Sequence, residues 1–184
     1  MKGCRMMQSK NMTLLLTVNA VIAAAYAALT IVLAPISYGP IQLRVSEAVT
    51  ALPFLMPGAV PGVVAGCVIA NLYTGNVLDI VFGSAATLLA ALMTAYFGRQ
   101  GSTVKNRLLG CSMPVLFNAV IVGAVLTWGY KIQEFPSALG SYGFNALTVG
   151  LGEMAVLFLL GYPLLVQLPK IKSVRALIDR VNQK

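Results

Sequence analysis

The sequence ISYGPIQLRVSEAVTA (residues 36–51) lies between two long apolar runs and carries two charged side chains, Arg44 and Glu47. The next charged residue along the chain is Asp79, far into the following apolar region. Charged groups are costly where a connection enters an apolar helix, so the grouping of Arg44, Ser46 and Glu47 indicates function. The structural alternative is a local ion pair, three residues apart, at the membrane surface.

Composition indicates an integral membrane protein. Of the 184 residues, 58% are hydrophobic and 10% are charged, whereas about a quarter of the residues in soluble domains are charged. The apolar runs have the length of helices and lack the short alternating pattern of an outer-membrane barrel. The net charge of +8 comes from basic residues at the two ends and in one loop. No aromatic residues are interleaved with them, so nucleic-acid binding is not expected.

The cysteines and the absence of histidine narrow the chemistry further. Cys4, Cys67 and Cys111 fit no metal-ligand spacing, and the sequence contains no His. We therefore interpret the cysteines as packing residues and expect neither a metal nor a cofactor. A Ser–His or Cys–His hydrolase is excluded, and no other nucleophile–base set points to an enzyme.

The order of apolar runs and helix breakers predicts an all-α bundle of six membrane helices. Four runs are each long enough to cross a bilayer: 13–34, 77–97, 111–130 and 145–168. The run 48–72 is interrupted by prolines and glycines near 57–61, so it is one kinked helix or two short ones. Counting two helices gives six crossings and places 11 of the 13 basic residues on one side. Because positive charge favours the cytoplasmic side, both termini are expected there.

This topology divides the chain into three parts: a cytoplasmic amino-terminal tail (1–12), a membrane domain (13–168) and a basic cytoplasmic carboxyl-terminal tail (169–184). A signal peptide ending near 25–27 is the competing interpretation of the first run. That run exceeds the apolar region of about 7–15 residues found in signal peptides, so we expect a retained helix. A turn is expected at 37–40, where the sequence reads Ser-Tyr-Gly-Pro.

Two stripes of small residues, spaced by four, predict close helix packing. One lies in the third helix and comprises Gly58, Gly62, Gly66 and Ala70. The other lies in the first helix, in two possible registers: Ala20, Ala24 and Ala28, or Ala23 and Ala27. From spacing alone, this second stripe fits packing within the bundle as well as contact with another protein.

In the predicted topology, the unusual polar groups gather in the extracellular half. They are Arg44, Ser46, Glu47, Asn71, Asp79, Asn118, Trp128, Tyr130 and Glu153. Glu153 is the sharpest signal, because a carboxylate about eight residues, or roughly 12 Å, into its helix must face a partner or a ligand.

Several of these residues also have structural interpretations. Glu153 could bond to a neighbouring helix, and Asp79 could cap a helix and complement its dipole. Trp128 and Tyr130 could be interfacial aromatics, and Asn71 could mark a helix end.

The charges of the candidate site indicate a class of ligand. Arg44 is opposed by three acids, Glu47, Asp79 and Glu153. A site of this balance with aromatic walls suits a small, flat ligand that is cationic or rich in hydrogen-bond donors. A carboxylate can accept two parallel N–H bonds, as from a guanine edge, or hold a primary ammonium.

Four segments, in this order, resemble the QueT family: APISYGPIQLRVSEA (34–48), PGVVAGCVIANL (61–72), LDIVFGSAATLLAA (78–91) and VGLGE (149–153). Members of that family are substrate-binding S components of energy-coupling-factor transporters. The resemblance implies a six-helix fold in a prokaryotic plasma membrane and uptake of a queuosine precursor, an aminomethyl-deazaguanine. It also implies docking onto a membrane scaffold subunit driven by two ATP-binding subunits. The docking face would be Ala20, Ala24 and Ala28, or Ala23 and Ala27.

On this basis Glu153 or Glu47 would pair with the guanine-like edge, Asp79 with the ammonium, and Trp128 or Tyr130 would stack on the base. The loop 36–47 would close over the ligand. The alternative is a stand-alone proton-coupled carrier in which Glu153 and Asp79 relay protons. The small size of the chain and its lack of internal repeats disfavour that alternative.

Overall fold

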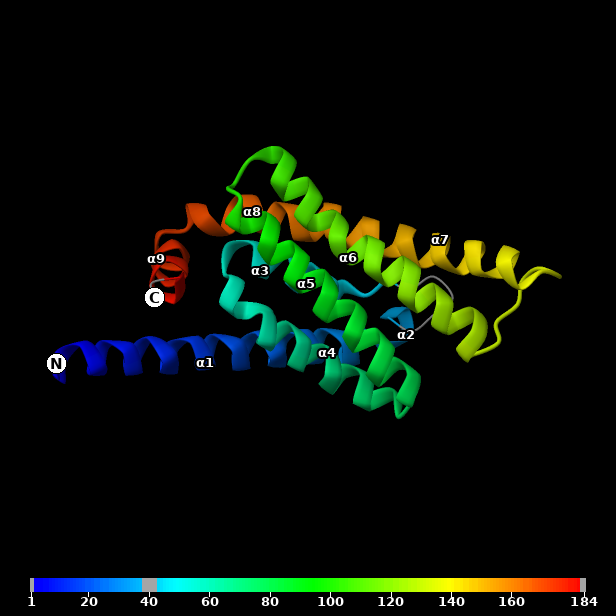
Figure 1. Cartoon of the computed structure of the whole chain (residues 1–184), viewed down its shortest axis with the longest axis horizontal. Helices are drawn as coiled ribbons and strands as arrows, with labels where there is room; N and C mark the ends of the chain where they lie inside the picture. The colour runs from blue at the N-terminus through cyan, green and yellow to red at the C-terminus, as the bar shows by residue number, and fades with distance from the viewer. Residues whose placement is uncertain (1, 38–42, 183–184) are drawn as a thin grey trace.

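The computed structural model describes residues 2–37 and 43–182, with side chains from Met12 onward. The described part of the chain contains helices and no strand, as predicted (Figure 1). The elements are α1 (Lys2–Val32), α2 (Ala34–Ser37), the 3-10 helices η1 (Val45–Ala51) and η2 (Pro57–Ala59), α3 (Leu52–Leu55), α4 (Val60–Thr74), the π-helices η3 (Asp79–Gly83), η4 (Val125–Gly129) and η5 (Leu157–Gly161), α5 (Ser84–Arg99), α6 (Val104–Ala124), α7 (Ala138–Val156), α8 (Tyr162–Gln167), η6 (Leu168–Lys170) and α9 (Lys172–Asn182).

Five helical stretches within these residues are long and apolar enough to cross a membrane. They are Met12–Val32, Pro57–Thr74, Asp79–Arg99, Val104–Gly129 and Ala138–Lys170. A sixth apolar stretch, Val45–Leu55, is shorter. The all-helical membrane architecture is therefore confirmed, while the sixth crossing and the cytoplasmic position of the termini stay predictions. The start of α1 and the end of α9 lie at the same end of the molecule (Figure 1).

The apolar run 48–72 divides in two, as the six-helix count requires. The break is Met56, whose extended backbone (φ −135°, ψ 87°) separates α3 from η2. Met56 precedes Pro57, and a residue before proline is disfavoured in the helical region. The proline therefore ends one helix and begins the next.

The glycine stripe of α4 packs directly on α1. A Cβ at Gly62 would lie 2.7 Å from the backbone oxygen of Asn19, and one at Gly66 would lie 2.7 Å from the Cβ of Tyr26. The Asn19 side chain donates to Gly58 O (2.9 Å) and accepts from Gly62 N (2.6 Å). Close backbone approach thus requires glycine at these positions, as the spacing predicted.

The same contact separates the two alanine registers of α1. Ala23 and Ala27 are buried within the bundle. Ala20, Ala24 and Ala28 lie on the exposed side of α1. Of the two registers, only Ala20, Ala24 and Ala28 remain accessible to another protein.

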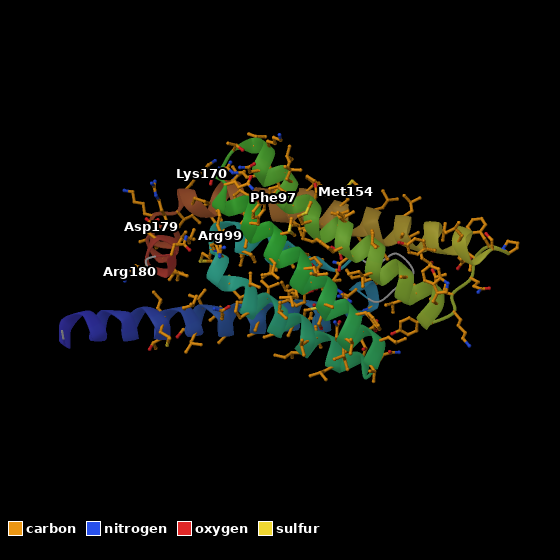
Figure 2. All side chains as sticks on the ribbon, viewed as in Figure 1. Phe97, Arg99, Met154, Lys170, Asp179 and Arg180 are labelled. Atoms are coloured by element: carbon orange, nitrogen blue, oxygen red, sulfur yellow. The ribbon has the colours of Figure 1, made fainter. Side chains whose placement is uncertain are left out.

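Helix α9 occupies most of the predicted carboxyl-terminal tail and packs back on the bundle. Val174, Ile178 and Val181 share one helical face and contact the apolar core that contains Ile22. The Asn182 side chain donates to Leu55 O at 2.9 Å. Figure 2 shows Arg180 and Asp179 on α9 at the same end of the molecule as Arg99 and Lys170. Most of the predicted basic tail is thus a helix that packs on the bundle.

Candidate ligand-binding site

A cavity of about 360 Å³ opens between α4, η3, the end of α6, η4 and the residue before η1. Its lining includes Arg44, Asn71, Asp79, Val122, Val125 and Tyr130. Four of these residues belong to the predicted site, and they come from widely separated parts of the sequence. The volume suits a small molecule, because ligand pockets begin at about 300 Å³.

Asp79 faces Tyr130 across the cavity wall. The Tyr130 hydroxyl donates to Asp79 Oδ2 at 2.6 Å, which joins η3 to the end of η4. The carboxylate thus bonds to another helix, beside space for a ligand.

Asn71 fixes η3 against α4. It is buried, and its Nδ2 donates to Asp79 O at 2.9 Å. Helix α4 runs past it to Thr74 and ends at Gly75, whose φ of +68° is the left-handed conformation common after a helix. The interpretation of Asn71 as a helix end is therefore wrong, and its side chain instead positions the segment that carries Asp79.

A buried polar cluster lies one helical turn of α6 beneath the cavity. Asn118 precedes the cavity-lining Val122 by four residues, so the two share a face of α6. The Asn118 side chain donates to Glu153 Oε1 at 3.0 Å and also interacts with Glu47. Glu47 and Glu153 are 0% and 3% exposed. The cluster thus brings together residues 47, 118 and 153, as the sequence predicted.

Arg44 belongs to both the cavity and the cluster. It lines the cavity, it is buried, and it interacts electrostatically with Glu47 and Glu153. The interpretation of Arg44 and Glu47 as a pair at the membrane surface is therefore wrong, because the two side chains are enclosed by other helices. One guanidinium faces two carboxylates in the cluster, with Asp79 as a third acid on the cavity wall.

Several acceptor oxygens in the cluster have no hydrogen-bond partner among the described residues. They are Oε2 of Glu47, Oε2 of Glu153 and Oδ1 of Asn118. An unpaired buried acceptor costs about 1–3 kcal/mol, and more when it is charged. The cluster is therefore rich in acceptors and would be stabilised by N–H donors.

Glu153 lies deeper than the sequence indicated. Helix α7 begins at Ala138, so Glu153 is about 22 Å of helix rise from its start rather than 12 Å. The Ser137 hydroxyl caps the helix by accepting from Gly140 N at 3.1 Å. The glycines of the first turns resemble a loop in sequence, because glycine is a poor helix former.

Trp128 does not reach the cavity. Its side chain is 55% exposed and stacks on Tyr142, with ring centroids 5.1 Å apart. Trp128 and Tyr130 are two residues apart, so they point to different sides of their helical segment. Of the two predicted stacking residues, Tyr130 alone lines the cavity.

Ser46 is buried and contacts α1 without lining the cavity. The Thr30 hydroxyl lies 2.6 Å from Ser46 Oγ, and the Tyr26 hydroxyl donates to Glu47 Oε1. Neither Tyr26 nor Thr30 is among the site residues predicted from the sequence. The available signal was their spacing of four, which places both on the side of α1 opposite the exposed alanines.

The predicted turn at 37–40 and the central part of the predicted closing loop 36–47 fall on residues 38–42, which lie outside the described residues. Closure of that loop stays a prediction.

Comparison with known proteins supplies an independent finding. A family model described as "QueT transporter" matches residues 16–170. A 72-residue segment is 39% identical to the protein named "Queuosine precursor transporter QueT" from Lactococcus lactis subsp. cremoris (strain MG1363). That segment covers 38% of this chain and 43% of the relative, less than half of its length. No solved structure matches the chain.

Proposed function

Because the chain belongs to the QueT transporter family, we propose that it is the substrate-binding S component of an energy-coupling-factor importer. Its ligand would be a queuosine precursor, an aminomethyl-deazaguanine, or a related deazapurine. The relative from Lactococcus is named for a queuosine precursor. The chain would have no catalytic activity of its own, and ATP would be hydrolysed by two separate subunits.

The unpaired acceptors of the buried cluster are the observation that carries this proposal. Oε2 of Glu47 and of Glu153 accept no hydrogen bond from the described residues, although both residues are almost fully buried. The guanine-like edge carries a ring N–H and an exocyclic amino group, which are donors that carboxylates accept well. Arg44 is a donor suited to the carbonyl on the same edge.

Asp79 supplies the second recognition element. It lies on the cavity wall beside Tyr130 and is separated from the buried cluster by Arg44, which belongs to both. We place the primary ammonium of the ligand at Asp79 and its flat ring against Tyr130. A ligand oriented in this way would place one end in the cavity and its donor edge toward the cluster.

The transport cycle proposed here uses the exposed side of α1. The ligand enters from outside, the loop 36–47 closes, and Ala20, Ala24 and Ala28 dock on a membrane scaffold subunit. These three alanines are exposed, whereas Ala23 and Ala27 are used in internal packing. Cytoplasmic termini agree with the shared end of α1 and α9 and with its basic side chains.

Calorimetric titration of the purified chain tests the function directly. We expect tight binding of aminomethyl-deazaguanine and no tight binding of guanine or thiamine. Glu153→Gln and Asp79→Asn should each weaken binding by about tenfold or more, because each removes a charged acceptor. Glu134→Gln is the matched control, since Glu134 is an exposed acid outside the cavity lining. Unchanged affinity in both site variants would refute the site.

A proton-coupled carrier working alone is the competing function. It would transport substrate in vesicles that contain only this chain, driven by a proton gradient. In that function Glu153, which lies beside Glu47, and Asp79, which lies beside Tyr130, would relay the protons. Uptake without partner subunits would support the carrier and contradict the importer subunit.

A further inference from the structure

We infer that Tyr26 is a positioning residue that makes the site selective for a ligand with an exocyclic amino group. This inference rests on the proposed function and names a residue of that site. Tyr26 lies on α1, is fully buried, and donates its hydroxyl to Oε1 of Glu47. The other oxygen of the same carboxylate, Oε2, has no partner among the described residues.

The Tyr26 hydroxyl bonds to one oxygen of Glu47, Oε1, and leaves the other, Oε2, for the ligand. A carboxylate side chain has a broad, soft terminal torsion, so an unrestrained Glu47 would turn freely between donors. With Oε1 held by a hydroxyl donor, Oε2 is left with a defined direction. A ligand amino group then meets an acceptor that is already oriented, and orientation before binding improves affinity.

A second contact from α1 holds the same segment through the side chain of Ser46. Thr30 lies one helical turn after Tyr26, and its hydroxyl is 2.6 Å from Ser46 Oγ. The segment therefore meets α1 at two consecutive residues, Ser46 and Glu47. Such support is needed because η1 is a single 3-10 helix that starts without a side-chain cap.

The inference predicts a change in selectivity rather than a uniform loss of affinity. An analogue without the exocyclic amino group retains the ring N–H and the carbonyl. It does not use the acceptor that Tyr26 orients. Removing the hydroxyl should therefore weaken the amino-bearing ligand and leave the analogue almost unaffected. General loosening of the fold would weaken both ligands equally.

The experiment compares Tyr26→Phe with the unmodified chain by calorimetry, using aminomethyl-deazaguanine and its counterpart lacking the exocyclic amino group. We expect affinity for the first to fall about tenfold and affinity for the second to change by less than about twofold. Tyr162→Phe is the matched control, because Tyr162 packs against an apolar cluster that does not include Glu47. Equal losses for both ligands, or no loss for either, would overturn the inference.

Failure of the unmodified chain to bind and failure of the variant to fold each have a separate meaning. If the unmodified chain binds neither compound, the proposed function itself fails, and the inference falls with it. If Tyr26→Phe does not fold, as judged by thermal unfolding, Thr30→Val replaces it because Thr30 supports the same segment. A loss confined to the amino-bearing ligand in Thr30→Val would support the positioning of Glu47 from α1, and an equal loss for both ligands would contradict it.

Discussion

Asn118 lies between two acids, Glu47 and Glu153, and interacts with both. Its amide nitrogen donates to Glu153 at 3.0 Å, while its own carbonyl oxygen is left in an acceptor-rich environment. A ligand that carries several N–H groups resolves this imbalance, since it presents donors to all of the unpaired oxygens. In the proposed site, ligand affinity would therefore depend on these unpaired acceptors.

Replacing Asn118 by Ala should destabilise the protein by about 1–3 kcal/mol, because Glu153 would lose a donor while staying buried. Thermal unfolding in detergent without ligand measures this loss. Asn182→Ala, which removes a bond at the exposed end of α9, is the control and should have a smaller effect. Equal stability of Asn118→Ala and the unmodified chain would show that Glu153 has no need of this donor.

Asp79→Asn should affect the ammonium more than the ring. We expect the variant to bind aminomethyl-deazaguanine about tenfold more weakly and to bind the parent deazaguanine, which lacks the aminomethyl group, almost unchanged. Competition binding with both compounds measures the difference. An equal loss for both would move the ammonium away from Asp79.

Among single residues, the sequence predicts those whose burial is energetically costly. Glu47, Asn118 and Glu153 stand out in apolar runs because each needs a partner, and the structure brings the three together. Tyr26 and Trp128 could not be assigned in this way. Tyrosine and tryptophan are common in membrane helices, so their roles depend on which neighbours the fold places beside them.

Among the elements, α1 and α4 pack closely, and this contact bears on the site. Gly66 allows α4 to approach Ala23 and Tyr26, and Tyr26 in turn holds Glu47. The packing of α1 on α4 and the orientation of the Glu47 carboxylate are therefore linked.

Gly66→Ala should destabilise the protein by about 1–3 kcal/mol, because the added Cβ would lie 2.7 Å from that of Tyr26. Ligand affinity should fall as well, since Tyr26 would move relative to Glu47. Gly143→Ala is a sharp control, because a Cβ at that helical position has no neighbour within 4 Å. Thermal unfolding and calorimetry on both variants would separate the two effects, and a stable Gly66→Ala with full affinity would contradict the link.

The helices could be predicted from the length of the apolar runs and the positions of the prolines. Their boundaries could be predicted less well. Met56 ends α3 where the prolines indicated a break. Helices α6 and α7 begin before their apolar runs, because Thr103 and Ser137 cap them and polar or glycine residues then form their first turns. The contact of α9 with the bundle depends on three apolar residues within a basic segment, a weaker signal than the charge.

For the whole molecule, one side of α1 contacts Glu47, and its exposed side is the face that we propose docks on a scaffold subunit. Ala24→Leu should abolish uptake in cells that contain the complete importer, because a larger side chain would separate α1 from the scaffold subunit. Ligand binding by the purified variant should be unchanged. Ala85→Leu, at an exposed position of α5, is the matched control. Normal uptake by Ala24→Leu would remove the docking role from this face.

The shortness of Val45–Leu55 also has a consequence for how the protein is made. About 20 apolar residues are needed for a helix to partition alone into a bilayer, and this stretch is shorter and contains Glu47. Its stabilising neighbour Asn118 and the nearby Glu153 lie on α6 and α7, which leave the ribosome much later. We therefore expect Val45–Leu55 to reach its final position only after the second half of the polypeptide has been inserted.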